Sequence, residues 1–135
     1  MIKKILVIDD HSDVRLLIKL ALKFDNYEIH EAFDAQLGLK MVHAVKPDLI
    51  LLDVNMPLRM EVSTKGVLNG LDLCRWLKSD AELSKIPVIF LSSEAYPEDI
   101  KAGMDVGADE YITKPFSLIN LIEVIAKTLS KRAMA

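Results

Sequence analysis

The chain has 135 residues, of which 51% are hydrophobic and 27% charged, and its formal net charge is −3. This length suits one domain with a substantial core, and the composition excludes a disordered or fibrous chain. The acidic balance gives no general attraction to nucleic acid, no apolar run is long enough to cross a membrane, and the first residues lack the pattern of a secretory signal.

Cysteine usage adds to this. The single cysteine, Cys74, excludes an internal disulfide and fits a reducing compartment, so we expect a cytoplasmic protein with no membrane contact. Cys74 falls within an apolar helical pattern, which favours a buried thiol over a nucleophile.

The first strand is predicted from Lys4 to Ile8, an apolar run that ends on Asp9 and Asp10. The helix that follows has Ser12 or Asp13 as a possible cap. Its apolar residues recur at helical spacing and are predicted to face inward; they are Val14, Leu17, Ile18, Ala21 and Phe24.

A weaker second strand is predicted from Tyr27 to Ala32. Asp34 then caps a second helix. The inward residues of that helix are Leu37, Met41 and Ala44.

The stretch from Pro47 to Pro57 is the centre of the chain. Its apolar run ends abruptly on Asp53, and such a continuous run is typical of a strand buried on both faces of a parallel sheet. Asp53 would then lie at the carboxyl end of the strand, where ligands gather in open α/β sheets. An ordinary turn is the alternative, because Asp, Asn and Pro all favour turns.

The third helix is predicted from Leu71 to Lys78, and a fourth strand from Pro87 to Leu91, ending on Ser92. The inward residues of the helix are Leu73, Trp76 and Leu77.

A fourth helix opens at Pro97, and Gly107 ends it in a left-handed conformation. Its apolar stripe is weak, with Ile100 and Met104 as the only clear anchors.

A fifth strand is predicted from Glu110 to Ile112, and Ser117 caps the last helix. A frayed tail is expected over residues 131–135. One face of the last helix is apolar, and its residues are Leu118, Leu121, Ile122, Ile125 and Leu129.

The alternation of strands and helices predicts a single α/β domain over residues 1–135, with a parallel sheet covered on both faces. Its strand ends bring polar side chains to one edge: Asp9, Asp10, Asp53, Ser92 and Lys114. Two bare carboxylates about 4 Å apart repel by roughly 4 kcal/mol at an effective dielectric near 20, so the acids need a cation or shifted pKa values. Oxygen ligands without His or Cys indicate Mg²⁺ before Ca²⁺. Carboxylate, Mg²⁺, lysine and hydroxyl together suit the capture of a phosphoryl group on an aspartate.

Four stretches in this order resemble the receiver domain of bacterial response regulators, most closely the stand-alone, CheY-like kind of chemotaxis regulators. They are Ile5–Asp10, Asp48–Pro57, Pro87–Ser93 and Gly107–Phe116. The resemblance covers nearly the whole chain. It implies a flavodoxin-like, doubly wound (βα)5 fold whose five-stranded parallel sheet has the order 2-1-3-4-5.

The resemblance also implies a role for each matching residue. Asp53 is the phosphorylation site; Asp10 is a direct Mg²⁺ ligand, Asp9 reaches the ion through water, and the backbone carbonyl of Asn55 is the third protein ligand. Ser92 is the switch hydroxyl that moves to the phosphoryl group.

Lys114 pairs with that group, and its bond to Pro115 is typically cis. Tyr111 is the aromatic switch residue, and Asn55 and Glu94 tune hydrolysis. The same pair of residue types occurs in fast-cycling chemotaxis regulators, which predicts a short-lived phosphoryl state.

Each role has a structural alternative. Asp9 and Asp10 could cap a helix, Ser92 could be a turn residue, Lys114 a surface lysine and Tyr111 an ordinary half-buried tyrosine. The histidines share no metal-ligand spacing and are interpreted as structural or surface residues, although His11 could tune the neighbouring acids; they are His11, His30 and His43.

The stretch 58–68 follows the strand that carries Asp53 and lengthens the usual connection by about nine residues. It is either a tolerated surface insertion or a segment that screens the phosphoryl group or selects a partner.

The predicted function is a response regulator of a two-component phosphorelay. A sensor histidine kinase or a histidine phosphotransfer protein would supply the phosphoryl group to Asp53 with Mg²⁺ as cofactor. A downstream protein would then bind the face of the fourth helix, fifth strand and fifth helix. The chain would be a monomer or a phosphorylation-dependent dimer, without direct nucleic-acid binding.

The predicted chain is a phospho-acceptor switch and not a true enzyme. One alternative is the N-terminal receiver module of a larger protein. Another is an aspartyl-phosphate phosphatase of the haloacid dehalogenase type, which would need a second acid where Asn55 stands. A flavodoxin-like flavin binder would need a hydroxyl-rich phosphate loop where Asp9 and Asp10 stand.

Overall fold

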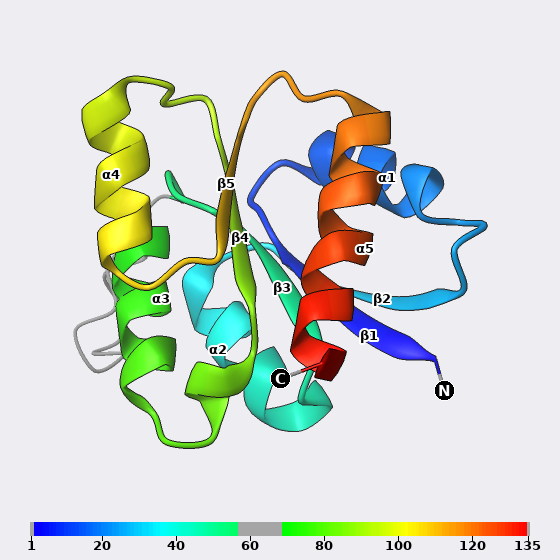
Figure 1. Cartoon of the computed structure of the whole chain (residues 1–135), viewed down its shortest axis with the longest axis horizontal. Coiled ribbons are helices and arrows are strands. Elements are labelled where there is room, and N and C mark those ends of the chain that lie inside the picture. Colours follow the sequence, from blue (N-terminus) through cyan, green and yellow to red (C-terminus); the bar gives the residue numbers. More distant parts are fainter. Residues whose placement is uncertain (1, 57–68, 135) are drawn as a thin grey trace.

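The computed structural model describes residues 2–56 and 69–134, so the predicted insertion 58–68 lies outside the described residues. Five parallel strands form one sheet in the order β2-β1-β3-β4-β5, which confirms the predicted topology (Figure 1). The strands are β1 (Lys3–Ile8), β2 (Tyr27–Ala32), β3 (Leu49–Asp53), β4 (Val88–Ser92) and β5 (Glu110–Thr113).

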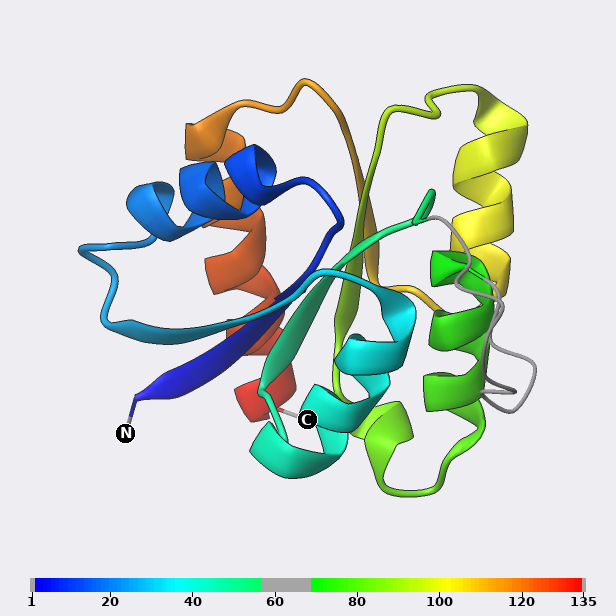
Figure 2. The same ribbon diagram turned by 180° about the vertical axis from the view of Figure 1, so that it is seen from behind.

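The helices cover both faces of this sheet, as Figures 1 and 2 show from opposite sides. One face carries α1 (Ser12–Ala21) and α5 (Leu118–Met134). The other carries α2 (Ala35–Val45), α3 (Gly70–Ser79) and α4 (Pro97–Asp105), and a short 3₁₀ helix (Leu83–Lys85) precedes β4. None of the described helices is both long and apolar enough to cross a membrane.

The sheet divides the core into two layers, because successive residues of a strand point to opposite faces. Leu52 and Phe90 pack in the layer beneath α2 and α3, whereas Leu51 and Ile89 pack beneath α1 and α5. Every residue of β3 and β4 is buried, which confirms the prediction of strands covered on both faces. Leu73 and Leu77 of α3 are buried, and Trp76 packs against the same layer, as predicted.

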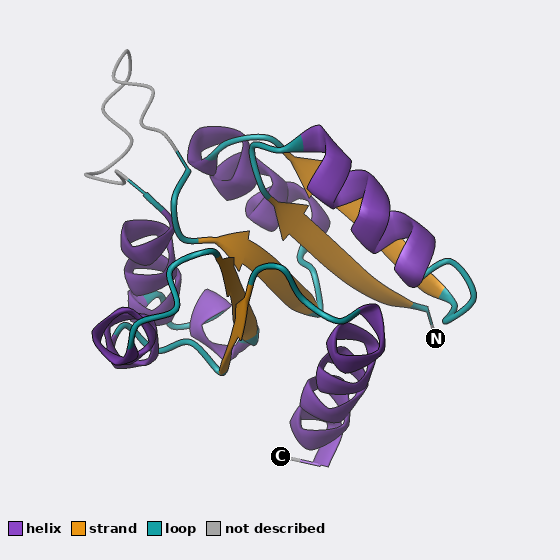
Figure 3. Ribbon diagram, turned by 90° about the horizontal axis from the view of Figure 1, so that it is seen from above, coloured by secondary structure: helices purple, strands orange, loops and turns teal. Residues whose placement is uncertain are grey.

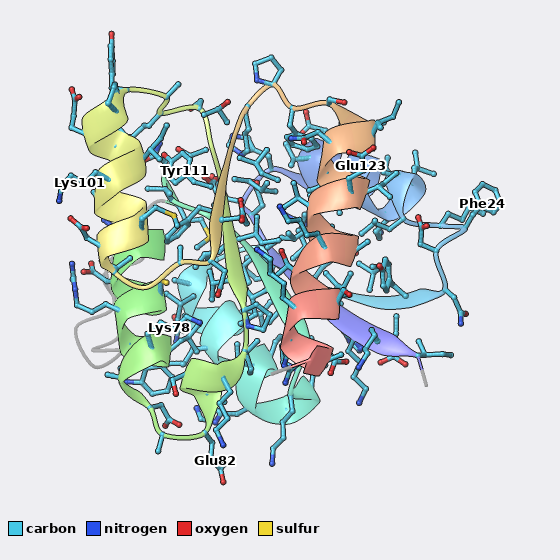
Figure 4. The ribbon with its side chains drawn as sticks, viewed as in Figure 1. Phe24, Lys78, Glu82, Lys101, Tyr111 and Glu123 are labelled. Carbon is cyan, nitrogen blue, oxygen red and sulfur yellow. The ribbon has the colours of Figure 1, made fainter. Side chains whose placement is uncertain are left out.

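The predicted inward face of α1 is wrong in part. Ile18 is fully buried, but Leu17 is 42% exposed. The helix ends at Ala21, so Phe24 lies in the following turn, where it is 90% exposed and projects from the edge of the molecule (Figure 4). The apolar spacing used to predict the inward face runs on to Phe24, past the end of the helix at Ala21.

The capping predictions had mixed outcomes. The side chain of Asp34 accepts a hydrogen bond from the Leu37 N–H at 2.7 Å, and that of Ser117 accepts one from the Asn120 N–H at 3.2 Å, so both caps are confirmed. Neither Ser12 nor Asp13 caps α1; its N-cap is His11, without a side-chain cap bond.

Glycines change which residues of α2 and α4 face the core. The buried residues of α2 are Gly38 and Val42, and Ala44 is exposed. In α4 the buried residue is Gly103, while the predicted anchor Met104 is 42% exposed. The predicted inward faces missed Gly38 and Gly103 because a glycine makes contact through its lack of a side chain.

The last helix is longer than predicted. Leu121, Ile125 and Leu129 are buried, although Leu118 at its start is 37% exposed. The helix continues through Met134, so residues 131–134 are helical, and fraying of this tail stays a prediction.

One side chain anchors this last turn to the sheet. Arg132 donates hydrogen bonds to the backbone oxygen and carboxylate of Asp48, at 2.8 and 3.1 Å. Both ends of the described chain lie at the end of the sheet where β1 begins (Figure 1).

Candidate functional site

Figure 3 shows the sheet from above, at its carboxyl edge. The polar residues that end or follow β1, β3, β4 and β5 lie at this edge. Asp9 directly follows β1, Asp53 ends β3 and Ser92 ends β4, and all three are buried. Lys114 follows β5, and its peptide bond to Pro115 is cis, as the resemblance implied. Ile8 pairs with Leu52, and Asp53 pairs with Leu91, so the polar residues that follow or end these strands fall at the same edge.

Lys114 lies between two carboxylates. Its ammonium is 2.9 Å from Asp9 Oδ2 and 3.6 Å from Asp53 Oδ2, and the lysine side chain is 17% exposed. Burial holds the pKa of the Asp53 carboxyl above its ordinary value, and the nearby Asp9 acts in the same direction. The hydrogen bond from the Asn55 N–H and the charge of Lys114 both lower that pKa. A single lysine therefore partly compensates two buried acids.

Asp10 completes the acidic group. Donor atoms of Asp9, Asp10, His11 and Asp53 all lie within 4.8 Å of one another. Among the described residues, Asp10 Oδ1 is the one buried side-chain oxygen that accepts no hydrogen bond. Oxygen-rich donors and a buried acceptor without a hydrogen bond fit a hard divalent cation, so this pocket can hold a metal ion.

His11 lies closer to this group than its spacing suggested. Its Nδ1 is 3.1 Å from both Asp9 Oδ1 and Asp10 Oδ1, and its backbone N–H donates to Asp9 Oδ1 at 2.9 Å. The side-chain hydrogen bond to Asp9 raises the pKa of the imidazole. The idea that His11 could tune the acids therefore has a geometric basis. The other two predicted non-ligands lie elsewhere, with His30 bonded to Glu28 and His43 edge-on to Trp76.

A chain of contacts leads from Ser92 to Tyr111. The hydroxyl of Ser92 accepts a hydrogen bond from the Glu94 N–H at 3.0 Å, and the Glu94 carbonyl accepts one from the Tyr111 hydroxyl at 2.7 Å. The Tyr111 ring packs beside Phe90 and against Gly103 of α4, and burial raises the pKa of its hydroxyl. The main chain of Glu94 thus links the two residues that were predicted to act as switches.

Asn55 lies two residues beyond Asp53. Its backbone N–H donates to Asp53 Oδ1 at 3.1 Å, and its side chain is exposed at the rim of the site. The metal-ligand role of its carbonyl and the hydrolysis-tuning role of its side chain stay predictions.

Two residues that support the site were missed from the sequence. Gly70 begins α3 against the backbone of Asp53 and Val54, a contact that a glycine beside the N-cap Asn69 does not by itself reveal. Arg15 donates from Nη1 to the backbone oxygen of Asp9 at 2.6 Å. No sequence pattern predicts this contact of Arg15, because an arginine on an amphipathic helix is ordinarily a surface residue.

Cys74 is fully buried, and burial raises the pKa of its thiol to about 11. A thiol in this state is not a nucleophile at neutral pH, which agrees with the structural role predicted for it.

The chain is similar to known proteins in sequence and in fold. The family model described as "Response regulator receiver domain" matches residues 5–126. The phosphate regulon transcriptional regulatory protein PhoB of Pseudomonas aeruginosa is 37% identical over 129 residues, which are 96% of this chain and 52% of that protein. The transcriptional regulatory protein PrrA of Mycobacterium leprae is 33% identical over 96% of this chain and 51% of its own length. The chain therefore spans about half the length of these curated relatives.

Solved structures of similar fold cover nearly the whole chain. The chemotaxis protein CheY4 of Vibrio cholerae has a TM-score of 0.81 and 26% identity, covering 94% of this chain and 98% of its own. The receiver domain of a signal transduction histidine kinase from Syntrophus aciditrophicus has a TM-score of 0.81 and 31% identity, covering 96% and 91%.

Proposed function

The chain belongs to the receiver-domain family of two-component response regulators, and from this membership we propose that Asp53 is its phosphoryl acceptor. One observation carries the proposal. The Asp53 carboxylate is buried at the carboxyl edge, 3.6 Å from the Lys114 ammonium and beside the carboxylates of Asp9 and Asp10. A nucleophilic carboxylate, a fixed cation and a metal-binding acid group are the parts that phosphoryl capture needs.

In the proposed reaction, an Asp53 oxygen attacks the phosphorus of a phosphohistidine on a histidine kinase or phosphotransfer protein. The new O–P bond forms as the N–P bond breaks, and the imidazole leaves with the electron pair. A small phospho-donor can replace the protein donor. Mg²⁺ bound by Asp10, Asp53 and the Asn55 carbonyl, with Asp9 acting through water, would supply positive charge for the phosphoryl oxygens.

Lys114 has two tasks in this proposal. Before phosphorylation it compensates Asp9, to which it is closer than to Asp53. After phosphorylation Asp53 carries about −1.5 to −2 charges instead of one, which favours movement of the ammonium toward it. The added negative charge is thus met by a cation already in the site.

The output follows from the contacts of Ser92. If its hydroxyl turns to the phosphoryl group, the hydrogen bond with the Glu94 N–H is lost, and the Tyr111–Glu94 bond is free to rearrange. Because Tyr111 packs against α4, this would alter the face formed by α4, β5 and α5. Such contacts exist in one state only and shift a pre-existing equilibrium. A downstream protein, or a second copy of the chain, would read that face.

The curated relatives PhoB and PrrA are named as transcriptional regulators, and this chain matches about half of each. Within the described receiver we propose output by protein contact, with no enzyme activity beyond phosphotransfer and autodephosphorylation. If the receiver is a module of a longer protein, the same face would act on whatever is attached to it.

The proposal is tested by incubating the protein with Mg²⁺ and acetyl phosphate and measuring its intact mass. We expect a phosphoryl adduct in the wild type, none in Asp53→Asn, and an adduct in the control Asp13→Asn, which alters an exposed acid of α1. An adduct of equal yield in Asp53→Asn would overturn the assignment. Sustained turnover of phosphate esters would instead favour the phosphatase alternative.

A further inference from the structure

We propose that Arg15 is a positioning residue that holds the peptide between Asp9 and Asp10 so that Asp10 is aimed into the metal pocket. This inference rests on the proposed function and names a residue outside the acidic group itself. Arg15 lies on α1, which begins directly beyond the carboxyl end of β1 (Figure 2). Its side chain is only 15% exposed, although it carries a full charge.

Arg15 contacts the main chain at the point where β1 ends. Nη1 donates to the backbone oxygen of Asp9 at 2.6 Å, and this oxygen belongs to the peptide that joins Asp9 to Asp10. On its other side, the Asp9 N–H donates to the Ala32 oxygen at 3.1 Å, which extends the pairing of β1 with β2. Arg15 therefore fixes the plane of the first peptide after the sheet ends.

Arg15 is itself anchored by Glu31. Nε donates to Glu31 Oε1 at 3.0 Å, and Glu31 lies on β2, opposite Val7 of β1. Lys19 binds the other oxygen of the same carboxylate at 2.8 Å. Because the guanidinium is planar and holds two partners at once, the Asp9 oxygen is tied to the neighbouring strand through a rigid group.

Asp9 and Asp10 differ in how their carboxylates are held. The carboxylate of Asp9 is held directly, by the Lys114 ammonium and by the backbone and ring nitrogens of His11. The His11 Nδ1 also lies 3.1 Å from Asp10 Oδ1, but its hydrogen bond is to Asp9, and in the described part of the chain Asp10 Oδ1 accepts no hydrogen bond. The direction of Asp10 is therefore set mainly by its backbone, and that backbone is what Arg15 holds.

A purely structural ion pair is the competing explanation, and electrostatics separates the two. Replacing Arg15 by methionine removes a positive charge near a cation site, which by itself would strengthen Mg²⁺ binding. Loss of positioning would weaken it, by about tenfold to a hundredfold, as for other residues that orient metal ligands. The two explanations predict opposite signs.

The experiment measures the Mg²⁺ dissociation constant by calorimetric titration for the wild type, Arg15→Met and the matched control Lys19→Met. The control also removes a cation from Glu31 but does not touch Asp9. We expect at least tenfold weaker binding in Arg15→Met, and equal or tighter binding in Lys19→Met. Equal or tighter binding in Arg15→Met would overturn the inference. If Arg15→Met does not fold, Arg15→Lys keeps the positive charge but lacks the planar guanidinium that holds two partners at once. Wild-type Mg²⁺ affinity in Arg15→Lys would also overturn the inference.

A second readout needs no metal. In the metal-free protein we expect the amide NMR signals of Asp10 and His11 to shift or broaden in Arg15→Met and to stay unchanged in Lys19→Met. If the wild type bound no Mg²⁺, the proposed metal role of the site would fail, and these amide signals would still decide the positioning role. Unchanged signals in Arg15→Met would refute it.

Discussion

Gly70 lies so close to Asp53 that a β-carbon on the glycine would overlap the carbonyl oxygen of the aspartate. The same β-carbon would be 2.9 Å from the Val54 Cα, and the Gly70 N–H donates to the Val54 oxygen at 3.1 Å. Gly70, the first residue of α3, therefore packs directly against the main chain of Asp53, the proposed phosphoryl acceptor. Asp53 cannot shift along its strand without a matching shift of α3.

This contact makes Gly70→Ala a severe substitution. The obstructing atoms are backbone, which cannot turn away as a side chain can, so we expect a loss of about 2–3 kcal/mol in the free energy of unfolding. Urea denaturation measures it. Gly38→Ala is the matched control, because there the new atom meets the flexible end of Ile8 at 2.7 Å and alanine favours the helix by about 1 kcal/mol. Similar losses in the two variants would contradict this view of Gly70.

The position of Lys114 predicts a metal-dependent change in stability. Lys114→Met leaves two buried carboxylates without their cation, so we expect the metal-free protein to lose about 2 kcal/mol. Magnesium should then raise the melting temperature more in this variant than in the wild type, because the ion replaces the missing charge.

The control for that experiment is Lys78→Met, which removes a lysine of similar exposure that pairs with Asp109 away from the site. It should lower stability without changing the response to Mg²⁺. An identical Mg²⁺ response in both variants would argue against a shared role of Lys114 and the ion.

Glu31 predicts a pH dependence. Its hydrogen bond with Lys19, assisted by Arg15, holds the pKa of its carboxyl below the ordinary value. A lowered pKa in the folded state stabilises the protein above the ordinary pKa, and this contribution is lost as the pH falls through the folded-state pKa. We expect Glu31→Gln to be less stable than the wild type by about 1 kcal/mol at pH 7 and nearly equal at pH 3. Urea titrations at both pH values check this, and a difference that grew toward pH 3 would contradict it.

Gly103 predicts a change at the switch tyrosine. A β-carbon there would lie 2.8 and 3.0 Å from two carbons of the Tyr111 ring and 3.2 Å from Phe90, so Gly103→Ala should displace the ring and weaken its bond to Glu94. Figure 4 shows Tyr111 on the side of the sheet that α4 covers. Fluorine NMR of fluorotyrosine-labelled protein should show the Tyr111 signal shifted in Gly103→Ala. The control Met104→Ala, at an exposed neighbour, should leave it in place, and an unmoved signal in both would count against the contact.

The strands and the polar edge of the sheet could both be predicted, because one sequence pattern locates both: an apolar run that ends on a polar residue. Apolar runs end on Asp9, Asp53 and Ser92, so one pattern located the strands and the polar residues at their ends. Parallel pairing then required those ends to meet.

Other features could not be read from the sequence. The inward faces of α2 and α4 depend on Gly38 and Gly103, which contact the core by lacking side chains, so an apolar period does not register them. The clamp of Arg15 needs Glu31, sixteen positions away, to be opposite Val7. That juxtaposition is a product of strand register and is invisible until the sheet is assembled.

The bond between Arg132 and Asp48 has a practical consequence for reporting on the switch. It fixes the last turn of α5 at the end of the sheet where β1 begins, away from the carboxyl end of β3 and from the start of α4. A fluorophore coupled near Lys131 would therefore lie on a turn that is hydrogen-bonded to Asp48, directly before the start of β3. Paired with a second dye on α4, it would register displacement of that helix relative to the start of the sheet, without obstructing a phospho-donor.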